Sequence, residues 1–251
     1  MEKQYDYKLD FIDSMDLFNH VKNTVSGYSF KMNLKNFNSN LIDPIKLTFD
    51  SIVYSQGIEQ TIENEVLRQL DKTNSNLIGY FHQNIFHYIG DGWTVPKTGY
   101  DIQSEAQNIF VEMKNKHNTM NSSSSAKTFM RMQSTIIKHP EATCMLVEVI
   151  AKHSQNIPWV VTLDGQRQAS TNQIRKVSID KFYELVTGNK NAFFELCKII
   201  PTVIQDVVSE IKINEKQNTV FAELNEISDD LLSSIYLLSF ERYEGFKKFK
   251  F

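Results

Sequence analysis

The sequence has little of what marks several specialised classes of protein. It holds only two cysteines, Cys144 and Cys197, both in apolar surroundings, so we expect reduced core residues and no disulfide or metal site. No apolar run approaches the roughly 18 residues of a membrane-spanning helix. The stretch from Met1 to Asp6 carries no apolar signal core. We therefore expect a cytoplasmic protein with no membrane partner.

Several signatures of nucleotide-dependent or covalent chemistry are also missing. The chain has no Gly-x-x-x-x-Gly-Lys loop, no dinucleotide fingerprint, no zinc pattern and no Gly-x-Ser-x-Gly elbow. ATP-driven, redox and serine-hydrolase functions therefore lack support.

An excess of positive charge is absent as well, since the formal net charge is -3. That value at first argues against a nucleic-acid partner. The charge is unevenly spread, however: residues 91–139 hold six cations and four anions, whereas residues 206–242 hold three cations and eight anions. Because a local basic cleft can bind DNA on a protein of negative total charge, composition leaves a DNA partner open.

What is present indicates a folded α/β protein. Of the 251 residues, 41% are hydrophobic and 23% are charged, which excludes a long disordered tail and a collagen-like repeat. We expect a single domain over 1–251, with a core at about 60–165 and a helical C-terminal part at about 178–251. The fold class is a central mixed β-sheet flanked by helices, with helical additions at both ends. Expected helices lie near 59–70, 74–89, 122–139, 179–186, 192–200 and 203–211, and expected strands at 101–104, 109–114, 145–151 and 158–163.

The chemistry-bearing stretch is Asp101 followed by Glu112-Met113-Lys114. On a strand, Glu112 and Lys114 point to one face, while Met113 points to the other. If strands 101–104 and 109–114 form a hairpin that turns between Ala106 and Gln107, Asp101 faces Glu112 with Cβ atoms about 5 Å apart. Ala106-Gln107 is a poor tight turn, which favours a longer loop.

Two carboxylates this close repel each other unless a cation lies between them. Mg²⁺ takes one or two protein carboxylates together with waters and a phosphate oxygen. A neighbouring lysine can orient the attacking water or stabilise charge at phosphorus. The alternative is a surface ion-pair ladder on an edge strand. Glu210-Ile211-Lys212 serves as a control, because it matches the same pattern within a helix.

Polar residues around this stretch suit contacts with DNA phosphates and base edges. The alternatives are a polar loop after the lysine, a solvated face on the next helix, and a plain surface turn near residue 166. On the helix expected at 122–139, Ser134 and Lys138 lie on the same polar face as Lys127 and Arg131. The loop near residue 166 also includes Gln168. The DNA-binding candidates are Lys97, Thr98, Asn115, Lys116, His117, Asn118, Thr119, Lys127, Arg131, Gln166 and Arg167.

The order of aspartate, strand, Glu-x-Lys, polar loop, helix and buried strand resembles the PD-(D/E)xK nuclease superfamily. The runs 99–103 and 111–119 resemble type II restriction endonucleases of that superfamily, nearest to the group that cuts GGNCC. The resemblance covers about residues 60–165. Tyr100 stands where the motif's name has proline, a position that varies widely in such enzymes.

This resemblance implies a restriction-endonuclease-like fold with Asp101 and Glu112 as Mg²⁺ ligands and Lys114 as the catalytic lysine. The backbone carbonyl of Met113 is a further candidate ligand. Related nucleases often add a glutamate from an upstream helix. Glu65 is the candidate here, with Glu63 or Glu59 as fallbacks, and the alternative for Glu65 is an exposed helix glutamate.

The function that the resemblance implies is a Mg²⁺-dependent type II restriction endonuclease that leaves 5′-phosphate ends. A homodimer is expected, because cutting both strands of a palindrome requires two sites related by a two-fold axis. The alternatives are another nuclease of this fold in DNA repair or recombination, a non-catalytic DNA-binding module, and a helical interaction protein that uses the acidic C-terminal segment.

Overall fold

The computed structural model describes residues 5–163, 165–168, 171–211, 217–243, 246 and 249–251. The chain divides into two compact units, each described by itself below. The first comprises Met1–Ser26 and Ile78–Ile211, and the second comprises Gly27–Leu77 and Lys212–Phe251. Among the described residues, no helix is long and apolar enough to cross a membrane. The single-domain organisation stays a prediction.

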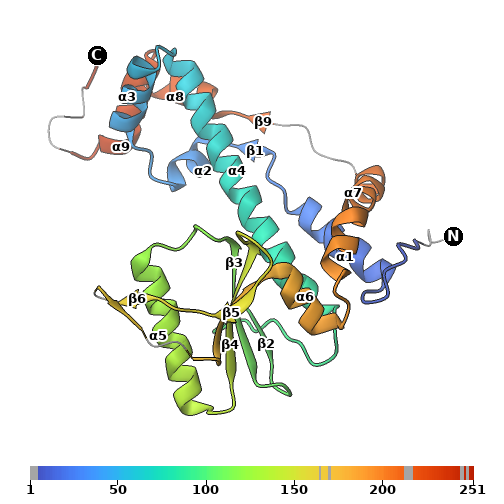
Figure 1. Cartoon of the computed structure of the whole chain (residues 1–251). Coiled ribbons are helices and arrows are strands. Elements are labelled where there is room, and N and C mark those ends of the chain that lie inside the picture. Colours follow the sequence, from blue (N-terminus) through green and yellow to red (C-terminus); the bar gives the residue numbers. More distant parts are fainter. Residues whose placement is uncertain (1–4, 164, 169–170, 212–216, 244–245, 247–248) are drawn as a thin grey trace. The chain divides into compact units, whose positions relative to one another are not determined.

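A five-stranded mixed sheet forms the centre of the first unit (Figure 1), which confirms the predicted α/β class. Its three central strands are parallel, and an antiparallel strand lies at each edge. Strands β6 (Thr162–Leu163) and β7 (Gln166–Arg167) form a separate two-stranded hairpin. The strand order is β2 (Ile102–Ser104), β3 (Ile109–Lys116), β4 (Thr143–Ile150), β8 (Ile174–Ser178) and β5 (Asn156–Pro158).

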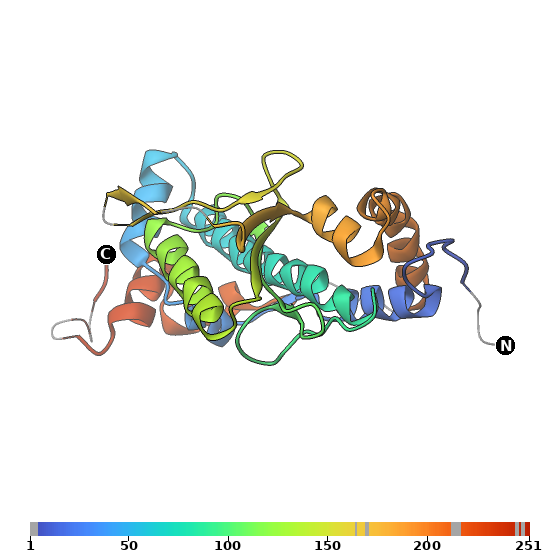
Figure 2. The ribbon, with the colours of Figure 1, turned by 60° about the horizontal axis from the view of Figure 1, so that its bottom comes forward.

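The two faces of this sheet are covered by different helices (Figures 1 and 2). One face packs Val111 and Met113 into a hydrophobic cluster with α1 (Ser14–Ser26), α6 (Ile179–Thr187) and α7 (Ala192–Glu210). The opposite face carries Phe110 and packs under α5 (Ser122–Lys138). Because β4 lies between two neighbours and under both layers, its apolar run is buried throughout from residue 144 to 148.

The second unit is mostly helical, with one short parallel strand pair. Strand β1 (Lys31–Met32) pairs with β9 (Gln217–Asn218). Phe37, Leu47, Ile62, Leu224 and Ile235 are buried in its hydrophobic core. The long helix α4 (Ile58–Asn84) contributes its residues up to Leu77 to this unit and the rest to the first. The remaining helices are α2 (Leu34–Ser39), α3 (Pro44–Val53), α8 (Val220–Ile227) and α9 (Leu231–Phe240).

Two pairs of predicted helices turn out to be single helices. The helices expected at 59–70 and 74–89 are α4 followed by the 3₁₀ turn η1 (Ile85–His87), because residues 71–73 contain no helix breaker. The helices expected on either side of Pro201 are the single helix α7. A proline removes one hydrogen bond from a helix interior, and the burial of Leu196, Val203 and Val207 across this position offsets that loss.

Other expectations also need correction. The strand predicted at 158–163 is split between β5 and β6, with Trp159 and Val161 buried between them. Strand β8 was not predicted. The N-cap of α5 is Asn121, whose side chain accepts a 2.8 Å hydrogen bond from the N–H of Ser124. Cys197 is exposed on α7, so only Cys144 is a core residue; both are free.

Candidate active site

The β2–β3 hairpin positions the two predicted carboxylates. Ile102 pairs with Val111 and Ser104 pairs with Ile109, which is the predicted register. The connection is a four-residue loop, Glu105–Asn108, and Asn108 adopts a left-handed φ of 51°. The longer loop that the poor turn sequence favoured is therefore present.

Asp101 lies directly before β2 and continues the hairpin through its side chain. Its N–H donates to the carbonyl of Val111 (2.9 Å), and its Oδ2 accepts from the N–H of Met113 (2.8 Å). Within a strand, the N–H and C=O of one residue point to the same edge. The carboxylate of Asp101 and the carbonyl oxygen of Met113 therefore share one edge of β3, where β2 no longer covers it.

Glu112 is held between two cations on the opposite face of β3 from Met113. Its Oε1 accepts a 2.6 Å hydrogen bond from Nζ of Lys114, and its Oε2 accepts from Nη2 of Arg131 on α5. The guanidinium of Arg131 also lies 4.5 Å from the centre of the Tyr100 ring and donates to the carbonyl of Gly99 (3.2 Å). The predicted strand face thus carries Glu112 and Lys114 together.

The electrostatics couple the two carboxylates. Burial raises the pKa of Asp101 above its ordinary value, and the negative charge of Glu112 raises it further. The Met113 N–H and the charges of Lys114 and Arg131 act in the opposite direction without cancelling the rise. A cation placed against Asp101 would relieve this penalty, because it favours the ionised carboxylate.

A second acid lies on the same sheet face and was missed by the sequence analysis. Glu148 of β4 stands in register with Lys114 and is only 2% exposed. Its Oε1 forms an ion pair with Nζ of Lys176 on β8 (2.8 Å). The available signal was a single glutamate inside the apolar run 145–151, which is unusual because a buried charge is costly unless it is paired.

The donor set fits a hard divalent cation. Among the described residues, no three acidic, histidine or cysteine side chains gather as a metal site. Asp101, Glu112 and the carbonyl of Met113 supply two carboxylates and one neutral oxygen. Mg²⁺ is commonly held by one or two carboxylates, with waters and substrate phosphate completing its shell. The oxygens present are therefore of the kind and number that Mg²⁺ takes beside a phosphate.

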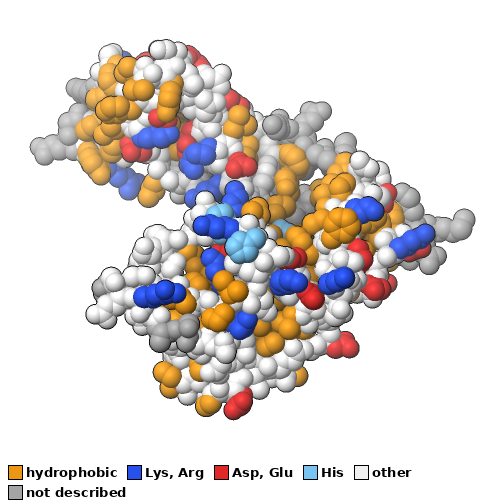
Figure 3. All heavy atoms as spheres, viewed as in Figure 1, with side chains coloured by type: hydrophobic (Ala, Val, Ile, Leu, Met, Phe, Trp, Pro, Cys, Tyr) orange, Lys and Arg blue, Asp and Glu red, His pale blue; other side chains and the backbone are white. Residues whose placement is uncertain are grey.

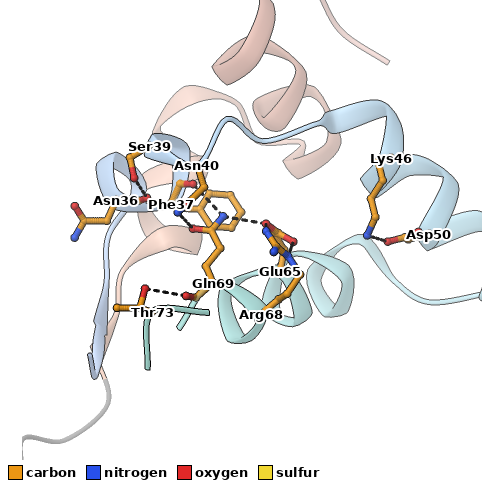
Figure 4. Close-up of polar contacts among 10 residues, drawn as sticks. All are labelled: Asn36, Phe37, Ser39, Asn40, Lys46, Asp50, Glu65, Arg68, Gln69 and Thr73. Atoms are coloured by element: carbon orange, nitrogen blue, oxygen red, sulfur yellow. Dashed lines mark hydrogen bonds and ion pairs between the residues drawn. The ribbon is translucent and has the colours of Figure 1, made fainter. Parts of the chain in front are cut away.

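Glu65 lies on α4 in the second unit, where a local network occupies its carboxylate (Figure 4). Arg68 donates two hydrogen bonds of 2.6 Å to it, and Gln69 donates one of 2.9 Å. Burial would raise the pKa of Glu65, but these hydrogen bonds bring it below its ordinary value. Of the fallbacks, Glu63 accepts from Asn218 (3.0 Å) and Glu59 is exposed. The role of Glu65 in catalysis stays a prediction.

Most candidate DNA contacts are exposed. The turn after β3 is closed by the N–H of His117, which donates to the carbonyl of Ile150 (3.0 Å), and by Thr119 Oγ1, which donates to the carbonyl of Lys116 (2.9 Å). Arg131 differs from the other candidates because it is bound to Glu112. Asn115 is half-buried, and the exposed candidates are Lys97, Thr98, Lys116, His117, Asn118, Thr119, Lys127, Gln166 and Arg167.

The helical control motif behaves differently from the strand motif. Glu210 is the last residue of α7 and accepts a hydrogen bond from the Tyr5 hydroxyl, while Tyr7 donates to Asp206 one turn earlier (3.1 Å). Lys212 lies outside the described residues. Asp206 and Glu210 therefore both accept from tyrosine hydroxyls, whereas Glu112 binds two cations.

Comparison with known proteins identifies the family of this chain. A family model described as the Eco47II restriction endonuclease matches residues 9–209. The type II restriction enzyme Sau96I of Staphylococcus aureus is 30% identical over 251 aligned residues, which cover 91% of this chain and 95% of that enzyme. The type II restriction enzyme Eco47II of Escherichia coli is 30% identical over 214 residues, covering 80% and 89%. The chain belongs to the Eco47II restriction endonuclease family.

Proposed function

We propose that this protein is a Mg²⁺-dependent type II restriction endonuclease that hydrolyses both strands of DNA and leaves 5′-phosphate and 3′-hydroxyl ends. Membership of the family supports sequence-specific cleavage of DNA. The observation that carries the proposed chemistry is the pairing of Glu112 with Lys114 on one strand face, beside a second carboxylate, Asp101. We expect the enzyme to act in the cytoplasm.

The residues of the site have three roles in the proposed reaction: holding the cation, donating to the reacting groups, and positioning Glu112. Asp101, Glu112 and the carbonyl of Met113 would hold the cation, which when bound acts as a Lewis acid on the phosphate. Lys114, whose side chain is 31% exposed, donates to the attacking water or to the phosphate oxygens, where negative charge develops. Arg131 is a positioning residue, because it fixes Glu112 through Oε2 while stacking on Tyr100.

DNA recognition would use the exposed candidates around this site. We assign Lys116 and Lys127 to phosphates, and Asn118 and Arg167 to base edges, because arginine reads guanine and asparagine reads adenine. We assign the recognition sequence to the GGNCC group, on the resemblance of runs 99–103 and 111–119.

Cutting both strands asks for two copies of the site, so we propose a homodimer. Helix α3 carries an apolar face that the described second unit leaves uncovered, with Ile45, Phe49, Ile52 and Val53 between 51% and 72% exposed. These residues recur at helical spacing, and Figure 3 shows hydrophobic side chains gathered over the part that Figure 1 labels α3. We assign this face to a second copy of the chain, because large exposed apolar patches mark interaction sites.

The decisive experiment is digestion of a plasmid of known sequence with Mg²⁺, with Ca²⁺ or with a chelator, followed by mapping of the ends. We expect discrete fragments with 5′-phosphates in Mg²⁺ alone, and no cutting by Glu112→Gln. The control Glu210→Gln should cut like the parent. Cutting at free ends or at branched structures would favour a repair nuclease, and binding without cleavage under any divalent ion would favour a non-catalytic module.

A further inference from the structure

Five charged side chains form a row across three neighbouring strands and one helix. Arg131 and Lys114 hold the two oxygens of Glu112, and Lys176 holds Oε1 of Glu148. Lys114 on β3 is in register with Glu148 on β4, so both lie on one sheet face, with their strands about 4.8 Å apart. The row therefore alternates in sign, and Lys114 lies between the two acids.

Two buried atoms in this row make no hydrogen bond with any described residue: Nε of Arg131, which is a donor, and Oε2 of Glu148, which is an acceptor. The Glu148 side chain is only 3% exposed, and its buried Oε2 makes no hydrogen bond with any described residue. A buried carboxylate oxygen without a donor is destabilising, and an apolar residue would suit the otherwise apolar interior of β4 better. The position is therefore costly for the fold, which points to a use in the site.

Lys114 is the group that can supply the missing donor. An ammonium has three N–H donors, and Nζ of Lys114 donates one hydrogen bond to Glu112. A divalent cation on Glu112 would compete with Lys114 for the carboxylate and repel its ammonium. Lys114 then needs another acceptor on this face, and Glu148 stands directly opposite it.

We propose that Glu148 is the positioning residue for Lys114: its free Oε2 accepts from Nζ of Lys114 when Glu112 binds a divalent cation. Lys176 fixes Glu148 through Oε1, so that Oε2 is presented toward β3. Lys114 then stays beside the reacting phosphate and does not swing into solvent. The inference rests on the proposed function in one respect, namely that Glu112 is a cation ligand.

The test is a double-mutant cycle read out by Mg²⁺ binding to the protein without DNA, using isothermal titration calorimetry. Glu148→Gln should weaken Mg²⁺ binding about tenfold, within the range seen when outer ligand-supporting residues are lost. In a Lys114→Met background, where no ammonium needs a new acceptor, Glu148→Gln should change Mg²⁺ affinity less than twofold. An equal loss in both backgrounds, or no loss in either, would overturn the proposal.

Controls separate this proposal from folding defects and from the proposed function itself. Thermal unfolding of each variant checks that it folds, and Glu148→Asp, which keeps the charge, supplies a second variant that should retain more affinity than Glu148→Gln. Glu184→Gln, which breaks the exposed pair with Lys181 (2.7 Å), should bind Mg²⁺ like the parent. If Glu112→Gln also binds like the parent, the cation site itself is wrong, which is a different result from failure of the cycle.

The same variants have a kinetic signature. In single-turnover cleavage, Glu148→Gln should react 10–100-fold more slowly at saturating Mg²⁺, while DNA affinity in Ca²⁺ stays within twofold of the parent. A variant that lost DNA affinity and rate together would indicate a structural role for Glu148 and would contradict the proposal.

Discussion

The side chain of Asp101 accepts a 2.8 Å hydrogen bond from the main-chain N–H of Met113, the residue between Glu112 and Lys114. Strand β2 has ended at this point, so the carboxylate takes the place of a neighbouring strand along the edge of β3. One aspartate thus has two tasks, since it completes the hairpin and supplies a charge to the site. Substitution by asparagine and by alanine separates these tasks.

Asp101→Asn should abolish cleavage and stabilise the protein at neutral pH. The amide oxygen still accepts from Met113, while the buried charge is lost. Because the folded-state pKa of Asp101 is raised, its ionisation costs stability as pH rises through that value, and the variant escapes the cost. Urea unfolding at pH 8 should show the gain, which shrinks at acidic pH.

Asp101→Ala is the matched control for this prediction. It removes the acceptor as well and leaves the Met113 N–H unpaired, so it should be less stable than Asp101→Asn by about 1–3 kcal/mol. Equal stability of the two variants would show that the hydrogen bond to Met113 contributes nothing.

Arg131→Ala should reduce cleavage more than DNA binding. Its guanidinium is bound to Glu112 and stacked on Tyr100, so its loss frees Glu112 to move. Lys127, one turn earlier on α5 and exposed, is the matched phosphate candidate. In salt titrations with Ca²⁺, Lys127→Ala should lower the slope of log affinity against log salt by about 0.9. An equal change of slope in Arg131→Ala would assign that residue to phosphate.

The free energy of unfolding should fall as pH drops from about 6.5 towards 4. Burial lowers the pKa of His82 to about 4, and the nearby His20 adds to this, so the folded state keeps His82 neutral while the unfolded chain takes up a proton. The stability is therefore present above the unfolded-state pKa and is lost below it, by on the order of 2–3 kcal/mol. Urea unfolding of the parent and His82→Gln across this range measures the effect.

Exposed His117 provides the control for His82. His117→Gln should keep the pH dependence of the parent, whereas His82→Gln should flatten it. If the two variants behave alike, the acid sensitivity comes from other groups.

Base and phosphate contacts should respond differently to sequence. Arg167→Ala should weaken binding to the cognate site by about 1–3 kcal/mol and to random DNA much less. Lys116→Ala should weaken binding to both about equally and reduce the salt slope. Titrations of each variant on cognate and scrambled duplexes in Ca²⁺ distinguish the two classes, and the reverse pattern would exchange the assignments.

Phe49→Glu should convert a dimer into monomers, because it places a charge on the exposed face of α3. Phe194 on α7 has the same exposed fraction, 65%, so Phe194→Glu is a matched control that should leave the dimer intact. Sedimentation velocity of both variants and the parent measures the outcome. A monomeric parent, on and off cognate DNA, would reject the homodimer.

Much of the site could be predicted because it depends on strand parity. Alternation along β3 places Glu112 and Lys114 on one face, and the hairpin register brings Asp101 beside them. Glu148 and Lys176 could not be found in this way. Their ion pair depends on the parallel pairing of β4 with β8, two strands about 30 residues apart in sequence, and local pattern does not fix that pairing. Arg131 was predicted to contact DNA, but its ion pair with Glu112 depends on how α5 packs on the sheet, which local pattern does not fix.

The alternation along β3 ties the proposed catalytic pair, Glu112 and Lys114, to correct folding. Val111 and Met113 are buried in the hydrophobic cluster, and Glu112 lies between them on the other face. A slip of one residue would drive a carboxylate and an ammonium into that cluster and bring two large apolar side chains to the surface. Chains that fold stably are therefore chains whose proposed catalytic groups are aligned, so a cell would carry few copies of this protein that bind DNA with a misassembled site.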